Sequence, residues 1–375
     1  MFAKLKELSD QRHDYAREWK KKTGGKVIGY FCTYAPEEIM YAAGVLPVRI
    51  LGSHEPLDIT ERHIFGMFCP FCRDVLAQGL KGRYDYLDGI MIAHSCLHIR
   101  QSYSSWKQHV PTGFTYYLPM PNHVQSPSAM PCLTQELASF KEAVEEWTGK
   151  SITDEALDRA IEVYNTNRRL MRQIYELRRS ENPPLTGLEA MYMTLSSQLT
   201  DKAENNKVLE QILKNLPERK LDRKTGIRLM MIGSENDDIA FIEMVEGVLG
   251  ATFVIDDHCT GSRYFWNEVI PDQDRLKAIA ARYVDRPRCP SKDWPARDRF
   301  KHVLQLAKDY KVEGALLIQQ KFCDPHEIDI PPLQELLNKN GIPTYFLEFD
   351  VTVPLGQFKI RIEAFLEMLE GELVF

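Results

Sequence analysis

The chain has 375 residues, a length that favours two or three domains over a single one. Hydrophobic residues make up 44% and charged residues 27% of the sequence, which is typical of an ordered globular protein and excludes a disordered one. The formal net charge of −6 gives no general attraction for nucleic acid or for an anionic membrane, so we expect neither as a partner.

The amino-terminal residues 1–22 alternate in charge at helical spacing and lack the apolar core of a signal peptide. No uninterrupted apolar stretch approaches the length that spans a membrane. We therefore expect a cytoplasmic protein. In that compartment the eight cysteines are more typical of free thiols, metal ligands or redox groups than of structural disulfides.

The first third of the chain predicts alternating strands and helices. Short apolar runs predict strands, and capped amphipathic runs predict helices between them, so an open parallel sheet is expected. The predicted strands are 26–31, 46–51, 89–93 and 115–121, and the predicted helices are 35–44 and 72–82. We assign residues 1–132 to an N-terminal α/β domain.

A helical segment, residues 133–224, follows and is broken at Asn182-Pro183-Pro184. The α/β pattern then returns in a C-terminal domain, residues 225–375. Its predicted strands are 226–234, 251–257, 313–318 and 342–350, and its predicted helices are 240–250 and 333–341. The predicted fold class is α/β, with two parallel-sheet domains and a helical segment between them.

Several cysteines occupy the ends of predicted strands. Cys32, Cys96 and Cys323 each follow a strand, and the carboxyl ends of parallel strands deliver their loops to one edge of a sheet. Cys69 and Cys72 lie just before a predicted helix, where backbone N–H groups and the helix dipole favour a thiolate. Cysteines from both α/β domains can therefore converge between the domains.

Other interpretations stay open at this point. Any one of these cysteines taken alone is as typical of a small buried apolar residue, and we assign Cys132, Cys259 and Cys289 to that role. The Cys69-Pro-Phe-Cys72 motif also matches a redox dithiol or half of a zinc site, although no second C-x-x-C completes it. An iron–sulfur cluster needs three or four thiolates and can take them from separate strand ends.

Four blocks of sequence resemble the 2-hydroxyacyl-CoA dehydratase and benzoyl-CoA reductase family; they are residues 29–52, 65–82, 89–107 and 319–329. Within that family the chain is most similar to a cluster-bearing catalytic subunit, of the B or C type, of class I ATP-dependent benzoyl-CoA reductase. The resemblance implies two flavodoxin- or Rossmann-like domains with a helical part. It also implies a heterodimer with a homologous subunit and a 4Fe-4S cluster in each subunit.

The family's three cluster cysteines correspond to Cys69, Cys96 and Cys323, which the resemblance therefore implies as the 4Fe-4S ligands. Cys32 and Cys72 are candidate further ligands. The chain departs from some dehydratase subunits at Ala35, where they have a cysteine.

The activity that the resemblance implies is an ATP-dependent reduction of the aromatic ring of benzoyl-CoA to a cyclohexadienoyl-CoA, in low-potential one-electron steps. The chain has no G-x-x-x-x-G-K-[ST] motif, so we expect separate activator subunits to hydrolyse the ATP. One alternative is a subunit of a radical 2-hydroxyacyl-CoA dehydratase. Another is a structural or electron-relaying partner of a catalytic paralogue.

Three residues are candidates for proton transfer at this site. His94 and His98 lie on either side of Cys96, which favours a reductase that needs proton donors. Glu37 lies near Cys32 in the first turn of a predicted helix, where it either complements the helix dipole or orients a proton donor or the thioester.

Four basic residues are candidates for binding coenzyme A. Arg263 lies in an aromatic loop, residues 256–269, that either contacts an acyl group or adenine or is buried at a domain interface. Arg286, Arg288 and Lys292 lie in a proline-rich loop that either contacts the CoA phosphates or faces solvent.

Overall fold

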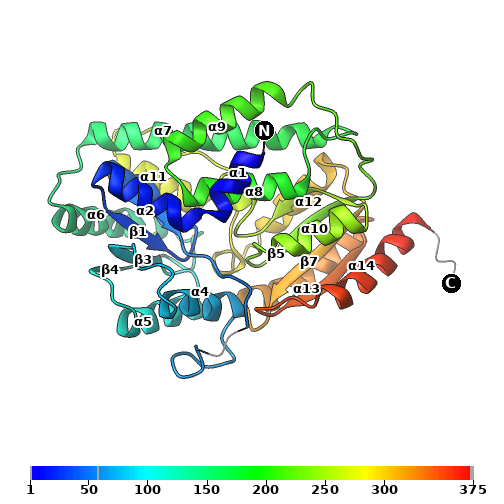
Figure 1. The fold of residues 1–375 in the computed structure, drawn as a ribbon, viewed down its shortest axis with the longest axis horizontal. Coiled ribbons are helices and arrows are strands. Elements are labelled where there is room, and N and C mark those ends of the chain that lie inside the picture. Colours follow the sequence, from blue (N-terminus) through cyan, green and yellow to red (C-terminus); the bar gives the residue numbers. More distant parts are fainter. Residues whose placement is uncertain (1, 57–58, 372–375) are drawn as a thin grey trace.

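The computed structural model describes residues 2–56 and 59–371. Two four-stranded parallel sheets lie in different halves of the molecule, and long helices cover them (Figure 1). This arrangement confirms the predicted α/β class with two flavodoxin- or Rossmann-like sheets. Among the described residues, no helix combines the length and the apolar character that crossing a bilayer requires.

The first sheet has the strand order β2-β1-β3-β4, so the order reverses between β1 and β3. All of its strands are parallel, and helices separate them along the chain. The elements of this part are α1 (Ala3–Asp10), α2 (Arg12–Thr23), β1 (Val27–Tyr30), α3 (Glu37–Ala42), β2 (Leu46–Arg49), α4 (Pro70–Leu80), β3 (Gly89–Ala93), α5 (Leu97–His109) and β4 (Phe114–Leu118).

The helices between the two sheets are α6 (Ala129–Thr148), α7 (Asp154–Glu176), η1 (Leu177–Arg179), α8 (Gly187–Leu199) and α9 (Lys202–Asn215). The predicted break at Asn182 to Pro184 falls between η1 and α8. Thr186 begins α8 with a capping box, in which its hydroxyl accepts from the backbone of Glu189 and the Glu189 carboxylate accepts from the backbone of Thr186. In the view of Figure 1, α7 and α9 lie above both sheets.

The second sheet repeats the topology of the first, with the order β6-β5-β7-β8 and a reversal between β5 and β7. Its elements are β5 (Arg228–Gly233), α10 (Ile239–Glu243), the π-helix η2 (Met244–Val248), β6 (Thr252–Asp257), η3 (Ser262–Tyr264), α11 (Arg275–Asp285), η4 (Pro290–Lys292), α12 (Arg299–Asp309), β7 (Gly314–Gln320), α13 (Asp324–Lys339), β8 (Thr344–Phe349) and α14 (Leu355–Glu370).

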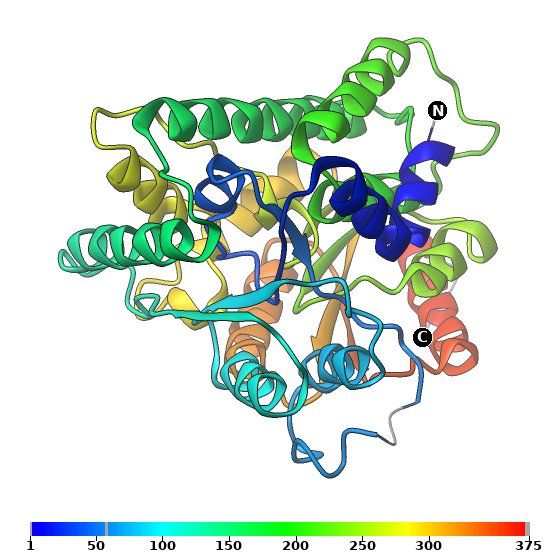
Figure 2. The same ribbon diagram turned by 60° about the vertical axis from the view of Figure 1, so that its left-hand side comes forward.

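Helices α5, α11, α12 and α14 have no counterpart among the predicted helices, and α13 differs from its prediction at its start. The helix predicted at 333–341 begins much earlier, at Asp324, and continues through Pro331 and Pro332. Each proline removes a helix hydrogen bond, and the buried side chains of Ile330 and Leu333 on the same helix offset that loss. Helix α11 was not predicted, and it packs on α6 and joins the core around the first sheet (Figure 2).

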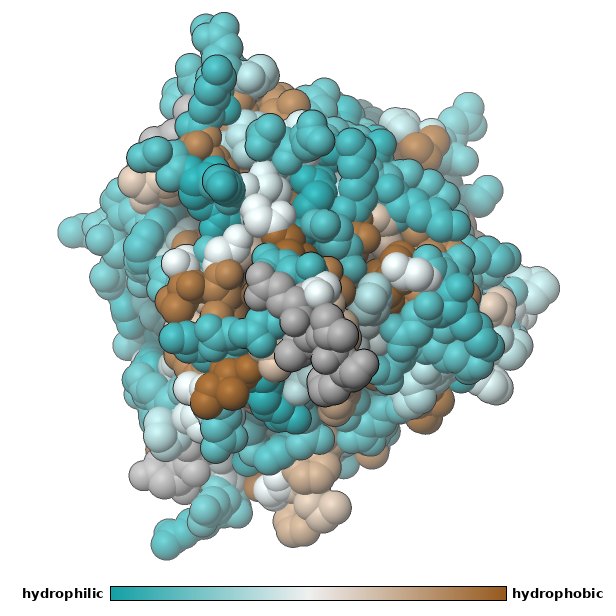
Figure 3. All heavy atoms as spheres, turned by 90° about the vertical axis from the view of Figure 1, so that its right-hand side faces the viewer, coloured by the Kyte–Doolittle hydropathy of each residue, from teal (hydrophilic) through white to brown (hydrophobic). Residues whose placement is uncertain are grey.

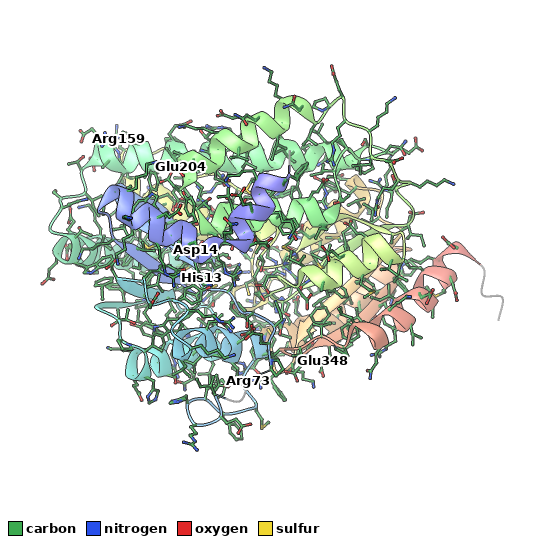
Figure 4. All side chains as sticks on the ribbon, in the orientation of Figure 1. His13, Asp14, Arg73, Arg159, Glu204 and Glu348 are labelled. Atoms are coloured by element: carbon green, nitrogen blue, oxygen red, sulfur yellow. The ribbon has the colours of Figure 1, made fainter. Side chains whose placement is uncertain are left out.

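The two sheets are tied together by shared packing. One apolar core contains Val48 of β2, Ile92 of β3, Met191 of α8 and Leu316 of β7. At the edge of this contact, Arg73 of α4 donates to Asp350, just after β8, at 3.0 Å; Figure 4 labels Arg73 and the neighbouring Glu348. The sheets are therefore held in one arrangement by apolar burial and by polar contacts at its rim.

Candidate functional site

One cavity, with an empty volume of about 770 Å³, has seven of the eight cysteines in its lining. These are Cys32, Cys69, Cys72, Cys96, Cys259, Cys289 and Cys323. The eighth, Cys132, is exposed on α6. The sequence predicted that thiols from both α/β domains can converge, and the cavity brings them together.

The position of the cavity follows from the topology of both sheets. Its lining includes Cys32 and Cys96, which follow β1 and β3, and Ser234 and Cys323, which follow β5 and β7. Those two strand pairs are the places where the strand order reverses, and ligands of open α/β sheets bind beyond the strand ends at such points. The two reversal points thus face the same space.

The three cysteines that the family resemblance implies as ligands share a local position. Cys69, Cys96 and Cys323 are the N-cap residues of α4, α5 and α13. The free N–H groups and the positive end of the dipole at each helix start favour a negatively charged sulfur. Three helix N-termini therefore surround the cavity and make it suitable for thiolates.

The pKa values of these thiols depend on burial and on their neighbours. Hydrogen bonds from Cys72 and His98 lower the pKa of Cys69, even though burial opposes the change. Burial raises the pKa of Cys96 to about 12, and burial together with the charge of Cys69 raises that of Cys323. Binding of a metal would therefore displace protons from Cys96 and Cys323.

Buried cations surround the thiols. Arg49, Arg263 and Arg286 line the cavity, each no more than 2% exposed, and Lys292 is fully buried beside it. Nε of Arg49 and Nε of Arg286 have no hydrogen-bond partner among the described residues. Arg263 is paired with Asp257, and Arg49 lies 3.8 Å from Glu235, but Arg286 and Lys292 have no carboxylate partner among the described residues. Because burying a cation is costly without a compensating negative charge, the lining beside Arg286 and Lys292 suits an anionic group.

The prediction of a solvent-facing basic loop is therefore wrong for Arg286 and Lys292, which are buried. Arg286 donates to the backbone oxygen of Thr33 at 2.5 Å, and Lys292 donates to the backbone oxygen of His94 at 2.7 Å. Arg288 is separate from them and forms an ion pair with Asp298 at 2.7 Å. The residues predicted for CoA do not form one exposed phosphate site.

The aromatic loop 256–269 has its Arg263 and Tyr264 buried, which fits the domain-interface alternative rather than an acyl or adenine contact. Nε of Arg263 donates to Asp257 at 2.9 Å, and the Tyr264 hydroxyl donates to Glu37 at 3.1 Å.

The candidate proton-transfer residues have different surroundings. His98 lines the cavity, and its Nδ1 accepts the backbone N–H of Cys69 at 2.9 Å. His94 and Glu37 are not among the lining residues. Glu37 instead accepts hydrogen bonds from buried tyrosines, including Tyr30 at 3.2 Å, in a polar network between α3, α7 and η3.

The donor set fits an iron–sulfur cluster better than a single ion. Within residues 2–56 and 59–371, no three ligating side chains converge on one metal position. A cluster distributes its thiolate ligands over several irons, so thiols spread around a cavity suit it, and thiolate is the ligand type that such clusters take. Cys69, Cys72, Cys96 and Cys323 all line this cavity.

Two lining cysteines were missed by sequence reasoning, which assigned Cys259 and Cys289 to the core. A signal was present for one of them, because Cys289-Pro290 repeats the Cys69-Pro70 pattern at a helix start. Cys259 follows β6, as Cys32 follows β1.

Comparison with known proteins connects this site to a family. The family model described as 2-hydroxyglutaryl-CoA dehydratase, D-component, matches residues 32–369. The chain is 28% identical to the C-type subunit of benzoyl-CoA reductase from Thauera aromatica, over 93% of this chain and 92% of that one. It is 26% identical to the (R)-phenyllactyl-CoA dehydratase beta subunit of Clostridium sporogenes, over 98% of both chains.

The chain is also 27% identical to the beta subunit of (R)-2-hydroxyglutaryl-CoA dehydratase from Acidaminococcus fermentans, over 93% of this chain and 94% of that one. All three relatives are subunits of acyl-CoA dehydratases or reductases. Because the family model spans nearly the whole chain, the protein belongs to the 2-hydroxyglutaryl-CoA dehydratase D-component family.

Proposed function

We propose that this chain is the iron–sulfur subunit of an ATP-dependent benzoyl-CoA reductase. The observation that carries the cluster assignment is the convergence of cysteines from both sheets on one cavity lined by buried cations. The similarity to a benzoyl-CoA reductase subunit over nearly the full length supports the choice of substrate. The net reaction adds two electrons and two protons to the aromatic ring of the thioester.

The residues of the chain would hold the cluster and exclude water. Cys69, Cys96 and Cys323 would bind iron. The helix N-termini that they cap favour their thiolate forms, against the burial that raises the pKa of Cys96 and Cys323. When bound, the cluster supplies single electrons at low potential.

His98 is the proton donor that this geometry favours. Its Nδ1 accepts from the backbone of Cys69, so the neutral ring carries its proton on Nε2, which lies 3.5 Å from a carboxylate oxygen of Asp324. Burial by itself would lower the pKa of His98, but the hydrogen bond with Cys69 and the charge of Asp324 raise it above its ordinary value. His98 can therefore hold a proton at the edge of the cavity.

The proposed partners are a homologous cluster-bearing subunit, ATP-hydrolysing activator subunits and an acyl-CoA substrate. The relatives are named as subunits of larger enzymes, which supports an assembly of this kind.

A second candidate function is the dehydration of a 2-hydroxyacyl-CoA by the same type of subunit. The similarity to the beta subunit of (R)-phenyllactyl-CoA dehydratase extends over 98% of this chain, and this observation supports the dehydratase as the second candidate.

The test begins with anaerobic purification of the chain together with its homologous subunit. We expect a brown protein that contains iron and acid-labile sulfide and that air bleaches. A colourless protein with stoichiometric zinc would contradict the proposal. With activator and ATP, loss of the aromatic absorbance of benzoyl-CoA supports the reductase, whereas conversion of a 2-hydroxyacyl-CoA without ring reduction supports the dehydratase.

A further inference from the structure

Three thiols of the cavity have no role in the proposed cluster. Cys32 lies in the turn after β1, Cys259 in the turn after β6, and Cys289 directly before η4. They come from both sheets and from the loop that follows α11, yet all three line the same space.

The seven thiols divide into two neighbouring sets. Cys72 is hydrogen-bonded to Cys69, which places it with the three cysteines of the proposed cluster and gives that set four thiols. In the other set, Cys259 and Cys289 are hydrogen-bonded to each other. The second set therefore has its own close thiol pair, with Cys32 as its third member.

The nearest charged side chains to the second set are positive, and of these Arg263 is paired with Asp257. Nη1 of Arg263 lies 3.8 Å from Sγ of Cys259. Arg286 donates to Thr33 and to the backbone oxygen of Arg263.

Lys292 lies three positions after Cys289, and its Nζ donates to the backbone oxygen of His94 at 2.7 Å, to that of Met120 at 3.3 Å and to Oδ1 of Asn122 at 2.7 Å. No ion pair of Arg286 or Lys292 with a carboxylate occurs in the described part of the chain, so their charges need another counter-charge.

We infer that Cys32, Cys259 and Cys289 bind a second iron–sulfur unit beside the first, so that the cavity holds one larger metal–sulfur assembly. This inference rests on the proposed iron–sulfur function and extends it. Three thiolates suffice to hold such a unit, and their negative charges would compensate the buried Arg286 and Lys292. An assembly with thiol ligands from both sheets would also fix the two halves of the molecule relative to each other.

Two other uses of these thiols make different predictions. A disulfide between Cys259 and Cys289 would remove both as ligands and leave Cys32 alone. Packing as small apolar residues would leave iron binding unchanged when they are replaced by serine.

The experiment is an iron and sulfide count on the full chain, purified anaerobically with its homologous subunit if it needs one. The chain is reconstituted with ferrous iron and sulfide alone. The variants are Cys259→Ser with Cys289→Ser, and separately Cys32→Ser, with Cys132→Ser as the matched control. We expect about eight irons per wild-type chain, about four in the double variant, and the wild-type count in the control.

Electron paramagnetic resonance of the reduced proteins is the second readout. The wild-type signal should show magnetic coupling between two neighbouring units, and the double variant should give the signal of an isolated cluster. If the double variant does not fold, as judged by circular dichroism, Cys32→Ser is evaluated by the same count and the same signal.

The outcomes separate this inference from the proposed function. About four irons in the wild type, unchanged in every variant, would overturn the second unit and leave the first intact. Absence of iron after reconstitution would overturn both. Thiol alkylation of the unfolded, unreduced chain that labels two cysteines fewer than the eight present would reveal a disulfide and would also overturn the inference.

Discussion

Cys323 has a position that depends on both the sheet and the helix next to it. It follows β7, and its backbone oxygen accepts the N–H groups of His326 at 2.9 Å and Glu327 at 3.0 Å in the first turn of α13. Its Sγ lies 3.3 Å from Nδ1 of His326. These contacts fix the thiol at the helix start, on the lining of the cavity.

Replacing Cys323 by serine is expected to remove most of the iron of the first cluster. Serine offers a harder and less acidic oxygen in place of a soft sulfur, and the remaining cysteines hold the cluster less firmly. The measurement is iron per chain after anaerobic purification, with Cys132→Ser as the control because that thiol is exposed on α6. Retention of full iron in Cys323→Ser, or equal loss in the control, would contradict the assignment.

The end of β5 shows a constraint at the scale of the element. Gly233, its last residue, has φ of 146° and pairs with Ile318 of β7. A Cβ added there would lie 1.8 Å from the backbone oxygen of Ile318. Only glycine therefore lets β5 and β7 approach each other at the point where the cavity begins.

Gly233→Ala is expected to destabilise the protein by at least about 3 kcal/mol, because neither strand can move without breaking the sheet. Chemical unfolding of the iron-free chain measures this. Gly247→Ala, at an exposed position of η2 with no atom within 4 Å of the added Cβ, is the matched control and should change stability by less than about 1 kcal/mol. Similar effects of both substitutions would show that the contact with Ile318 is not the constraint.

At the scale of the whole molecule, an ion pair joins two loops that follow strands of the two different sheets. Nε2 of His54, which follows β2, lies 2.7 Å from Oδ1 of Asp237, which follows β5. The Asp237 carboxylate raises the pKa of His54 from 6.5 to about 10, although burial opposes the rise. In return, the charge of His54 lowers the pKa of Asp237.

This pair should make stability depend on pH in a defined direction. The contribution of His54 is complete below pH 6.5 and is lost as the pH rises towards about 10. The contribution of Asp237 is complete above about pH 4 and is lost in more acidic solution. The stability lost in His54→Gln should therefore be largest between about pH 4 and 6.5, near 2 kcal/mol, and should shrink at higher pH. A loss that does not vary from pH 5 to 10, measured by chemical unfolding, would contradict this role.

The surface near the cavity favours a partner subunit. Met67, Leu97 and Ile328 are 59%, 45% and 65% exposed, and each lies within a few residues of a cavity-lining cysteine. By contrast, the face at the right of Figure 1 is largely hydrophilic, with apolar side chains in small separate groups (Figure 3). Exposed apolar side chains that gather near a functional site are typical of an interaction surface.

We expect the homologous subunit to cover these side chains. Met67→Asp with Ile328→Asp should weaken the complex at least tenfold, because the partner would have to bury two charges. Ile360→Asp is the control, since Ile360 is 69% exposed on α14. Native mass spectrometry of the co-expressed subunits measures the association. Equal complex formation by wild type and the double variant would place the interface elsewhere.

Local sequence patterns determined much of this protein. The apolar runs of both sheets, the break before α8 and the strand-end positions of Cys32, Cys96 and Cys323 are readable because strand burial and turn chemistry act between near neighbours in the chain. The four sequence blocks identified the family, which the full-length family match confirms. They also supplied the three ligand assignments, which stay predictions until iron is measured.

Only the tertiary structure decided how the remaining residues are used. Arg286 contacts Thr33 across 253 positions, and α11 packs on helix α6 far from it in sequence. Such contacts leave no periodic signal, so the sequence indicated a solvent-facing basic loop where burial against the thiols occurs. For the same reason the sequence could not distinguish Cys259 and Cys289 from core thiols. It also could not show that Glu37 lies outside the cavity that Cys32 lines. Their roles depend on where two sheets meet, which is set by long-range packing.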